Sequence, residues 1–364
     1  MRVALVHDWL TGMRGGEAVL AEIASFFPGA PIFTLLHRRG SITGELLRHP
    51  IHTTPLQALS AGGRFYRPLL PLMPQAVAGI RLEGFDVIIS SNHCVAKGVI
   101  PSPGSVHVCY CHTPMRYLWD QRQEYLARFP RWFRPLLSTR LERLRVWDVV
   151  SAARVDHFVA NSQWVARRIE RYWRRSAEVI PPPVDTEFFP PGGERARFIL
   201  MVAALVPYKR VDMGIAVAER LGLPLHVVGV GPLARSLARR AGPDVTFLGR
   251  ISGERLRDEY RSAALLLVPN VEDFGMVTVE ALACGTPVVG LRASGTADGV
   301  VSGEHGELAD ECTAEALATA CKKVLASRFA IDALRARAES FSRHRFRRRF
   351  SYLLERVLPG PAFA

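Results

Sequence analysis

Short runs of apolar residues alternate with longer segments of mixed polarity along the first half of the chain. The runs at 3–6, 31–35, 86–90, 106–111 and 157–160 have the length of strands and are flanked by polar or turn-forming residues. Between the first two, residues 17–27 carry apolar side chains at helical spacing, and Gly29 follows as a stop signal. Strands that alternate with helices predict a parallel, doubly wound sheet.

The same alternation restarts in the second half. Strands are predicted at 198–202, 225–228, 245–248, 264–268 and 287–290, with helices between them. One of these helices is predicted to span 278–284 and to end at Gly285. The fold class expected is therefore α/β, with two doubly wound parallel sheets of the Rossmann-like kind.

A segment rich in proline and glycine separates the two halves. Residues 181–193 contain five prolines and two glycines, a composition that excludes regular structure and indicates a linker. The predicted organisation is a first domain at 1–180, this linker, a second domain at 194–341 and a C-terminal helical segment at 342–364. A chain of 364 residues suits two cores of about 150 to 200 residues each.

The composition is that of a globular protein with a strong positive charge. Hydrophobic residues make up 48% of the chain, the mean hydropathy is +0.09, and no apolar run approaches the ~20 residues of a membrane span. The start of the chain has no signal-peptide pattern, so a cytoplasmic location is predicted. The 47 basic residues exceed the 34 acidic ones and give a net charge of +13, which favours polyanionic partners. The six cysteines show no Cys-x-x-Cys spacing, which suits reduced thiols.

Two glutamates, Glu272 and Glu280, flank the predicted start of the 278–284 helix. A helix N-terminus binds phosphate through its free N–H groups and the helix dipole. A carboxylate on either side can then hold hydroxyl groups attached to that phosphate, which predicts a site for a nucleotide diphosphate sugar. The alternative is that Glu272 is a solvated loop residue and that Glu280 is an ordinary first-turn glutamate stabilised by the dipole.

Together with Phe274, Gly275 and the Gly-Thr-Pro turn at 285–287, this pair resembles the Glu-x7-Glu signature of the retaining glycosyltransferases of family 4. The resemblance covers nearly the whole chain. It implies an enzyme of the GT-B fold, in which two Rossmann-like domains face each other across a cleft. It also implies that the last helix, predicted at 342–357, crosses back to the first domain.

The resemblance assigns roles to individual residues of this segment. Glu272 would face the transferred sugar, and Glu280 would hydrogen-bond the ribose of the nucleotide. The backbone of Gly275, Met276 and Val277 would contact the sugar, and Phe274 would belong to the same binding loop.

A second phosphate-binding element is expected near the N-terminus. Gly15 and Gly16 allow the backbone to approach a phosphate closely just before a helix begins. In the resembled family a Gly-Gly pair here lies near the donor diphosphate, and the alternative is a turn that merely needs positive φ.

Cations after the strands of the second half complete the expected donor site. Lys209 can place a point charge on the donor diphosphate and favour departure of the nucleotide, or it can be a solvated lysine at a helix start. The family usually has an arginine where this chain has Ala204, and Arg210 is the nearest candidate to compensate for it. Arg250 follows a predicted strand in the region where the family seats the nucleotide base.

The segment 107–112, His-Val-Cys-Tyr-Cys-His, contains four potential zinc ligands. On a strand, residues 107, 109 and 111 share one face too close together to converge on a tetrahedral metal, so no metal site is predicted. No Asp-x-Asp occurs either, and the donor is expected to bind without a metal or other cofactor. His112 ends a strand, where α/β sheets place their ligands, although a lone histidine is more often a packed one.

The continuation through residue 120, Cys-His-Thr-Pro-Met-Arg-Tyr-Leu-Trp-Asp, resembles bacterial mannosyltransferases in which the histidine equivalent to His112 contacts the donor sugar. By this resemblance the enzyme transfers mannose from GDP-mannose to a glycan or lipid-linked acceptor in the synthesis of cell-surface polysaccharides. A UDP-sugar donor remains an alternative. A nucleotide-sugar-binding protein or an epimerase of the same fold remains a second.

Two basic stretches, 116–145 and 343–350, interleave arginines with aromatic residues. Aromatic rings and cations together suit the interface of an anionic membrane, so peripheral contact with the inner face of the cell membrane is expected. The same composition can bind RNA, but a nucleic-acid-binding protein would leave the glutamate pair without a purpose. A solvated helix face is the third interpretation.

Overall fold

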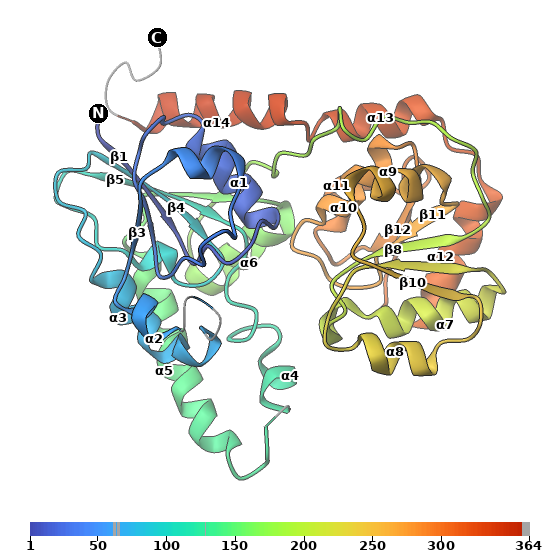
Figure 1. Ribbon diagram of the computed structural model, residues 1–364, viewed down its shortest axis with the longest axis horizontal. Coiled ribbons are helices and arrows are strands. Elements are labelled where there is room, and N and C mark those ends of the chain that lie inside the picture. The colour runs from blue at the N-terminus through green and yellow to red at the C-terminus, as the bar shows by residue number, and fades with distance from the viewer. Residues whose placement is uncertain (61–62, 64–65, 128, 359–364) are drawn as a thin grey trace. The chain divides into compact units, whose positions relative to one another are not determined.

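The computed structural model describes residues 1–60, 63, 66–127 and 129–358 (Figure 1). The chain divides into two compact units, Met1–Pro181 with Arg347–Ala364, and Pro182–Phe346. The last six residues of the predicted segment 342–364 lie outside the described residues. Within the described ranges, no helix combines the length and the apolar character needed to cross a membrane.

The first unit is built on one parallel sheet with the strand order β3-β2-β1-β4-β5-β6-β7. Its strands are β1 (Val3–His7), β2 (Ile32–Thr34), β3 (Ile51–Thr53), β4 (Val87–Asn92), β5 (Val106–Cys111), β6 (His157–Ala160) and β7 (Glu178–Val179). The central strands β1 and β4 are buried along their whole length, and each begins with a run of apolar residues and ends in polar ones.

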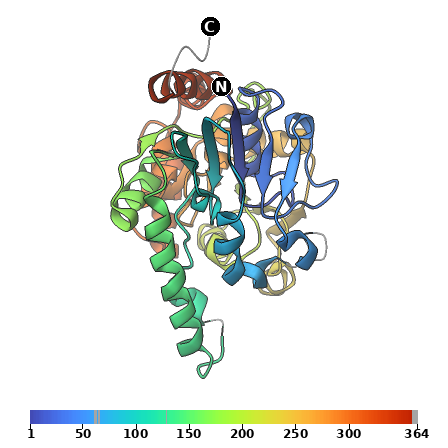
Figure 2. The same ribbon diagram turned by 90° about the vertical axis from the view of Figure 1, so that its left-hand side faces the viewer.

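Helices connect these strands. They are α1 (Gly15–Ala24), η1 (Gly44–Arg48), α2 (Leu56–Leu59), η2 (Arg67–Leu72), α3 (Met73–Ala78), η3 (Ala96–Gly98), α4 (Arg122–Ala127), α5 (Arg134–Ala152) and α6 (Gln163–Trp173). The longest, α5, runs along the sheet and projects past the ends of its strands (Figure 2).

The C-terminal helix α14 (Arg343–Val357) packs on the first unit. Phe350 is fully buried, and its ring centroid lies 5.5 Å from that of Phe26 after α1. Arg347 donates a 2.7 Å hydrogen bond to Glu22, and Arg356 pairs with Glu178 of β7. Phe346 and Phe350, the two phenylalanines of the basic stretch 343–350, are both buried and thus belong to the core.

The second unit repeats the architecture with the strand order β10-β9-β8-β11-β12-β13, again all parallel. Its strands are β8 (Ile199–Val202), β9 (Leu225–Val228), β10 (Val245–Gly249), β11 (Leu265–Leu267), β12 (Val288–Leu291) and β13 (Gly306–Ala309). Its helices are η4 (Pro207–Lys209), α7 (Val211–Leu221), α8 (Ala234–Arg240), α9 (Gly253–Ser262), α10 (Met276–Ala283), α11 (Thr296–Gly299), α12 (Ala314–Ala326) and α13 (Ile331–Glu339).

Every strand predicted from the apolar runs is present, within two residues at each end. The prediction missed β3, β7 and β13. These strands either lie at a sheet edge with exposed polar residues, as β3 does, or are too short or too poor in large apolar residues to stand out. The predicted helix at 17–27 instead begins at Gly15 and ends at Ala24.

An ion pair lies in the core of the first unit. The Nζ atom of Lys97 lies 3.0 Å from Oδ1 of Asp148, and both side chains are fully buried. Lys97 also donates hydrogen bonds to the Asp148 carbonyl and to Ser151 Oγ. The indole N–H groups of Trp119 and Trp173 donate to Oδ2 of Asp148 at 2.9 and 2.8 Å. Trp119, an aromatic of the stretch 116–145, is therefore held by the core.

Candidate functional site

Both sheets place polar side chains at the point where their strand order reverses. In the first sheet this point lies between β1 and β4, and in the second between β8 and β11. At such a switch point the connections leave in opposite directions, so a crevice opens at the carboxyl ends of the two strands. His7 and Ser91 lie at this position in the first unit, and Lys209 and Glu272 follow the corresponding strands of the second.

Lys209 and Glu272 form an ion pair in the second unit. The Nζ atom of Lys209 lies 2.5 Å from Oε1 of Glu272, with the two side chains only 17% and 14% exposed. Burial alone would lower the pKa of Lys209, but the charge and hydrogen bond of Glu272, together with the charges of Tyr208 and Asp273, raise that pKa. The lysine is consequently a fixed cation at neutral pH.

The loop that carries Glu272 is held by the segment after β12. The backbone N–H of Glu272 donates to Oγ of Ser294 at 3.0 Å, and its carbonyl accepts from the Gly295 amide at 2.8 Å. A Cβ atom on Gly295 would lie 2.1 Å from the carbonyl oxygen of Asp273, so only glycine allows this close approach. The sequence predicted no role for Ser294 and Gly295. The Ser-Gly-Thr triplet at 294–296, which follows a predicted strand, is the pattern that could have indicated them.

Gly275 begins helix α10 in the left-handed conformation, with φ of +86°. The helix therefore starts at Met276, two residues earlier than predicted, and the amides of Met276 and Val277 occupy its first two positions. Phe274 is buried, and its ring centroid lies 5.5 Å from that of Phe341. Its side chain thus anchors the loop in the core, and only its backbone is placed to contact a ligand.

The earlier helix start changes the position of Glu280. Glu280 is the fifth residue of α10, so it lies in the second turn, and the alternative of an ordinary first-turn glutamate is wrong. Burial raises the pKa of Glu280, and the phenol of Tyr260, which donates a 2.7 Å hydrogen bond to Oε2, acts in the opposite direction. The Glu280 carboxylate is therefore held in place by the Tyr260 phenol and is not a freely solvated side chain.

The other residues predicted to contact the donor, Arg210 and Arg250, also lie on the second unit. Arg210, with φ of +50°, pairs with Asp212, and its Nη1 lies 3.5 Å from Sγ of Cys312. Arg250 is exposed directly after β10. Ala204 is exposed in the loop after β8, where a longer side chain has room.

In the first unit, Ser91 links two histidines. His7 Nδ1 lies 3.1 Å from the Ser91 carbonyl, which can only accept, so the proton of His7 is on Nδ1. The Ser91 hydroxyl lies 2.8 Å from Nε2 of His112 and can donate to it, which leaves Nδ1 of His112 as the N–H donor. Burial lowers the pKa of His112 to about 3 and that of His7 to about 4, so both are neutral at physiological pH.

A buried carboxylate orders the neighbouring loop. Asp8 accepts hydrogen bonds from the four successive backbone amides of residues 93–96, at 2.6 to 2.9 Å. The ring of His93 also approaches Asp8, with Nδ1 3.0 Å from Oδ2. Burial alone would lower the pKa of His93, but the charge and hydrogen bond of Asp8 raise it. The structure thus adds Asp8 and His93, which sequence reasoning did not single out, to the group around His112.

Helix α1 begins beside this group. Gly15 and Gly16 are its first two residues, and a Cβ atom on Gly16 would lie 3.7 Å from Nε2 of His112. The helix N-terminus therefore lies next to the imidazole, which gives the predicted Gly-Gly element a position at the same site as His112.

The potential zinc ligands at 107–111 point into the core. The His107 ring bridges Ser90 Oγ at 2.8 Å and the Arg154 carbonyl at 3.1 Å, and Cys109 and Cys111 are fully buried. Among the described residues, no cluster of three or more histidine, cysteine or acidic side chains has the geometry for a metal ion.

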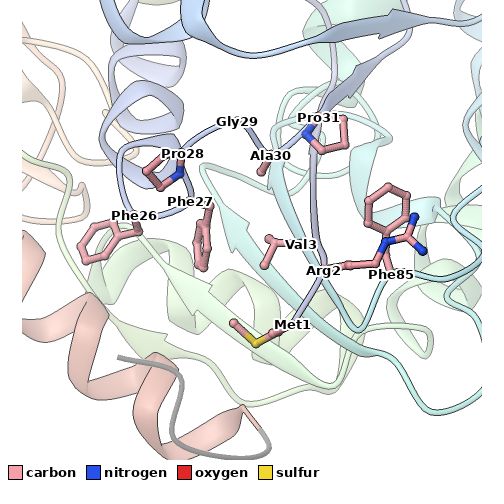
Figure 3. Close-up of a pocket in the computed structure, with 10 residues that line it drawn as sticks. All are labelled: Met1, Arg2, Val3, Phe26, Phe27, Pro28, Gly29, Ala30, Pro31 and Phe85. Atoms are coloured by element: carbon pink, nitrogen blue, oxygen red, sulfur yellow. The ribbon is translucent and has the colours of Figure 1, made fainter. Parts of the chain in front are cut away.

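A pocket of about 540 Å³ lies elsewhere on the first unit (Figure 3). It is at the amino end of β1 and is lined mainly by apolar and backbone atoms. Its residues are Met1, Arg2, Val3, Phe26, Phe27, Pro28, Gly29, Ala30, Pro31 and Phe85. Because the sites of α/β sheets lie at the carboxyl ends of the strands, this pocket is separate from the group around His112.

Comparison with known proteins identifies two adjoining domains. Residues 13–188 match the family described as Glycosyltransferase Family 4, and residues 185–345 match the family described as Glycosyl transferases group 1. A D-inositol 3-phosphate glycosyltransferase of Rhodococcus opacus (strain B4) is 31% identical over 230 residues, which are 52% of this chain and 51% of that protein. The chain spans about half the length of the curated relatives it matches.

Solved structures of similar fold cover nearly the whole chain. Sucrose-phosphate synthase from Thermosynechococcus elongatus matches with a TM-score of 0.73 and 17% identity, over 98% of this chain and 99% of that one. Anabaena Alr3699/HepE in complex with UDP-glucose matches with a TM-score of 0.69 and 18% identity, over 98% and 100%. The predicted fold class, two doubly wound parallel sheets of the GT-B type, is confirmed.

Proposed function

Because the chain consists of a glycosyltransferase family 4 domain followed by a glycosyl transferases group 1 domain, we propose that it is a retaining glycosyltransferase that moves a hexose from a nucleotide sugar. One observation supports this most directly. At the switch point of the second sheet, Lys209 and Glu272 meet beside the N-terminus of the helix that carries Glu280. Cation, free amides and two carboxylates are the groups that a sugar diphosphate requires.

Each group has a distinct role in donor binding. Lys209 holds the diphosphate, and Glu280 accepts a hydrogen bond from the ribose. Glu272 and the amides of Met276 and Val277 contact the transferred sugar. Because Lys209 and Glu272 already pair, the diphosphate binds by replacing Glu272 as the partner of the lysine. Glu272 is then released toward the sugar hydroxyls.

Around this core, two arginines of the second unit and two glycines of the first unit are further proposed binding residues. On the first unit, Gly15 and Gly16 begin helix α1 and offer its N-terminus to an anionic group. Arg250 lies near the base, and Arg210 can add charge when it leaves Asp212. No metal or cofactor has a role in this scheme.

The proposed chemistry retains the configuration of the sugar. The bond between the anomeric carbon and the diphosphate oxygen breaks, and the acceptor oxygen forms its bond on the same face. The acceptor's proton passes to the leaving phosphate oxygen, so no protein nucleophile is needed. Lys209 stabilises the charge that develops on the leaving group. On the first unit, His112 is a neutral N–H donor suited to a sugar hydroxyl, and the acceptor is proposed to bind beside it.

The donor is proposed to be GDP-mannose. A UDP-sugar is the alternative, because HepE, which has a similar fold, was solved in complex with UDP-glucose. The test is thermal unfolding with excess GDP, UDP and ADP, because a ligand that binds only the native state raises the midpoint. A shift with GDP alone supports the mannosyltransferase, and a shift with UDP alone replaces mannose by another hexose. If none of the three nucleotides raises the midpoint, the proposal of a nucleotide-sugar enzyme is contradicted.

Two variants separate binding from transfer. Glu280→Ala is expected to weaken nucleotide binding, whereas Glu272→Ala is expected to remove transfer while the nucleotide still binds. Equal losses of both properties in both variants would contradict the assigned roles. A protein that binds the nucleotide sugar but releases no nucleotide with lipid-linked, oligosaccharide or inositol phosphate acceptors would be a binding protein or an epimerase.

The acceptor is proposed to be lipid-linked, and the enzyme to work on the inner face of the cell membrane. The support is the solvent-facing side of α5, where apolar and basic residues share one stripe. Trp132, just before the helix, is 81% exposed, and Val146 is 59% exposed. The exposed members of the stripe are Trp132, Leu136, Arg140, Arg143, Val146 and Val150. Apolar side chains flanked by cations fit an anionic lipid surface.

Vesicle sedimentation tests this surface. Vesicles of phosphatidylcholine with phosphatidylglycerol should bind the protein, and vesicles of phosphatidylcholine alone should bind it weakly. Trp132→Ser should reduce binding, and Leu47→Ser, which removes an apolar side chain of similar exposure on the same unit, should not. Equal binding to both vesicles, or equal effects of the two variants, would contradict the assignment.

A further inference from the structure

Tyr260 touches one of the proposed donor-binding residues from inside the core. It lies in α9 and is fully buried, and its phenol donates a 2.7 Å hydrogen bond to Oε2 of Glu280. Nothing in the sequence motifs points to this residue, because it is twenty positions away from Glu280 and on another helix.

The position of the Tyr260 ring is fixed from two sides. The ring of Phe189 meets it edge-on, with centroids 5.7 Å apart and an interplanar angle of 80°. The hydroxyl of Thr286 donates a 2.5 Å hydrogen bond to the Tyr260 carbonyl, which ties α9 to the turn before β12. The phenol is therefore presented to Glu280 by a rigid scaffold.

The direction of the hydrogen bond follows from the chemistry of the two groups. Burial raises the pKa of Tyr260 well above its ordinary value, so the phenol stays protonated and donates. Burial also raises the pKa of Glu280, and the hydrogen bond from Tyr260 counteracts this shift, which favours the ionised, accepting carboxylate. With Oε2 engaged, Oε1 is the oxygen left for a ligand.

We propose that Tyr260 is a positioning residue for the nucleotide: by holding Oε2 of Glu280, it aims the other carboxylate oxygen at a ribose hydroxyl of the bound nucleoside diphosphate. A glutamate side chain has three rotatable bonds, and fixing them in advance lowers the entropy lost on binding. This inference rests on the proposed function, because it takes Glu280 as the ribose contact.

The experiment is isothermal titration of GDP and UDP into the wild type and Tyr260→Phe, together with their 2′-deoxy and 3′-deoxy analogues. Phenylalanine keeps the ring and removes only the donor. For the ribonucleotide that the wild type binds, the affinity of the variant should fall about tenfold, the effect of one hydrogen bond to a charged group. Against the analogue that lacks the contacted hydroxyl, the two proteins should differ little.

Tyr110→Phe is the matched control. Tyr110 is an equally buried tyrosine of the first unit whose phenol donates to the Ile180 carbonyl at 2.9 Å. Its loss removes one buried hydrogen bond and should leave nucleotide affinity unchanged. Thr286→Val provides a second test, since it loosens the Tyr260 backbone without altering the phenol and should show a smaller loss with the same dependence on the ribose hydroxyl.

The outcomes distinguish a failure of the proposed function from a failure of the role of Tyr260. If the wild type binds neither nucleotide, the proposed function fails and the role of Tyr260 fails with it. If the wild type binds and Tyr260→Phe binds equally well, only the positioning role is overturned. A loss of the same size with the ribonucleotide and both deoxy analogues would show that Tyr260 merely stabilises the fold, which also overturns the proposal.

Discussion

Lys209 and Glu272 meet as an ion pair, Nζ to Oε1 at 2.5 Å, although 62 residues separate them along the chain. They meet because β8 and β11 are neighbours in the second sheet and each residue follows its strand. Within the proposed donor site, the carboxylate of Glu272 thus neutralises the charge of Lys209. Any phosphate that binds Lys209 competes with a carboxylate that is already in contact.

Replacement of Glu272 by glutamine is therefore expected to strengthen binding of a nucleoside diphosphate. The neutral amide competes less well for Lys209, so affinity should rise about threefold to tenfold in a titration with GDP or UDP. Lys209→Met should weaken the same binding. Weaker binding of the diphosphate by Glu272→Gln would mean that Glu272 holds the nucleotide directly.

Ala204→Arg should also strengthen diphosphate binding. The residue is exposed in the loop after β8, so a guanidinium can be accommodated there without displacing the core. Ala204→Gln is the control of similar length without the charge. The gain should appear only with arginine and should shrink as salt is raised, and identical affinities for the two variants would refute an electrostatic role of this position.

The first unit should lose stability as the pH falls from 6.5 toward 4. Burial lowers the pKa of His107 to about 4, from 6.5 in the unfolded chain. Between these values the unfolded state binds a proton that the folded state does not, so the free energy of unfolding decreases as the pH is lowered. His107→Gln should reduce this slope by about 1.4 kcal/mol per pH unit in urea unfolding at pH 5 and 6. An unchanged slope would show that His107 is protonated in the folded protein.

Removal of Lys97 should destabilise the first unit strongly. Lys97→Met leaves the buried Asp148 carboxylate without its cation, which costs about 3 to 5 kcal/mol in comparable pairs. Arg292→Met, which breaks the exposed pair with Asp310, is the control and should change the urea midpoint little. Similar effects of the two substitutions would contradict the buried character of the Lys97–Asp148 pair.

Parts of the candidate site could be predicted because they follow from local pattern. The strand before Glu272, the glycine at 275 and the end of β5 at His112 all appear in the order of apolar and turn residues. The start of α10 was placed two residues late, because the left-handed conformation of Gly275 and not an ordinary capping side chain begins that helix. This small difference moved Glu280 into the second turn and removed the interaction with the helix dipole that the alternative interpretation assumed.

The aromatic residues of the stretch 116–145 show the limit of composition. Trp119 donates to the buried Asp148 and its ring stacks on Tyr172 with centroids 4.5 Å apart, whereas Trp132 is 81% exposed. Residue type alone cannot separate these two tryptophans. Their environments depend on which face of the chain meets the sheet.

The sequence by itself determined the α/β class, the two successive sheets and the glutamate pair, because periodicity and turn chemistry act between neighbours in the chain. Only the tertiary structure decided which distant residues share an oxygen or a proton. Ser91 joins His7 to His112, Ser294 holds Glu272 and Tyr260 holds Glu280. These contacts join different strands and helices, and their existence depends on strand order and helix packing, which no local pattern specifies.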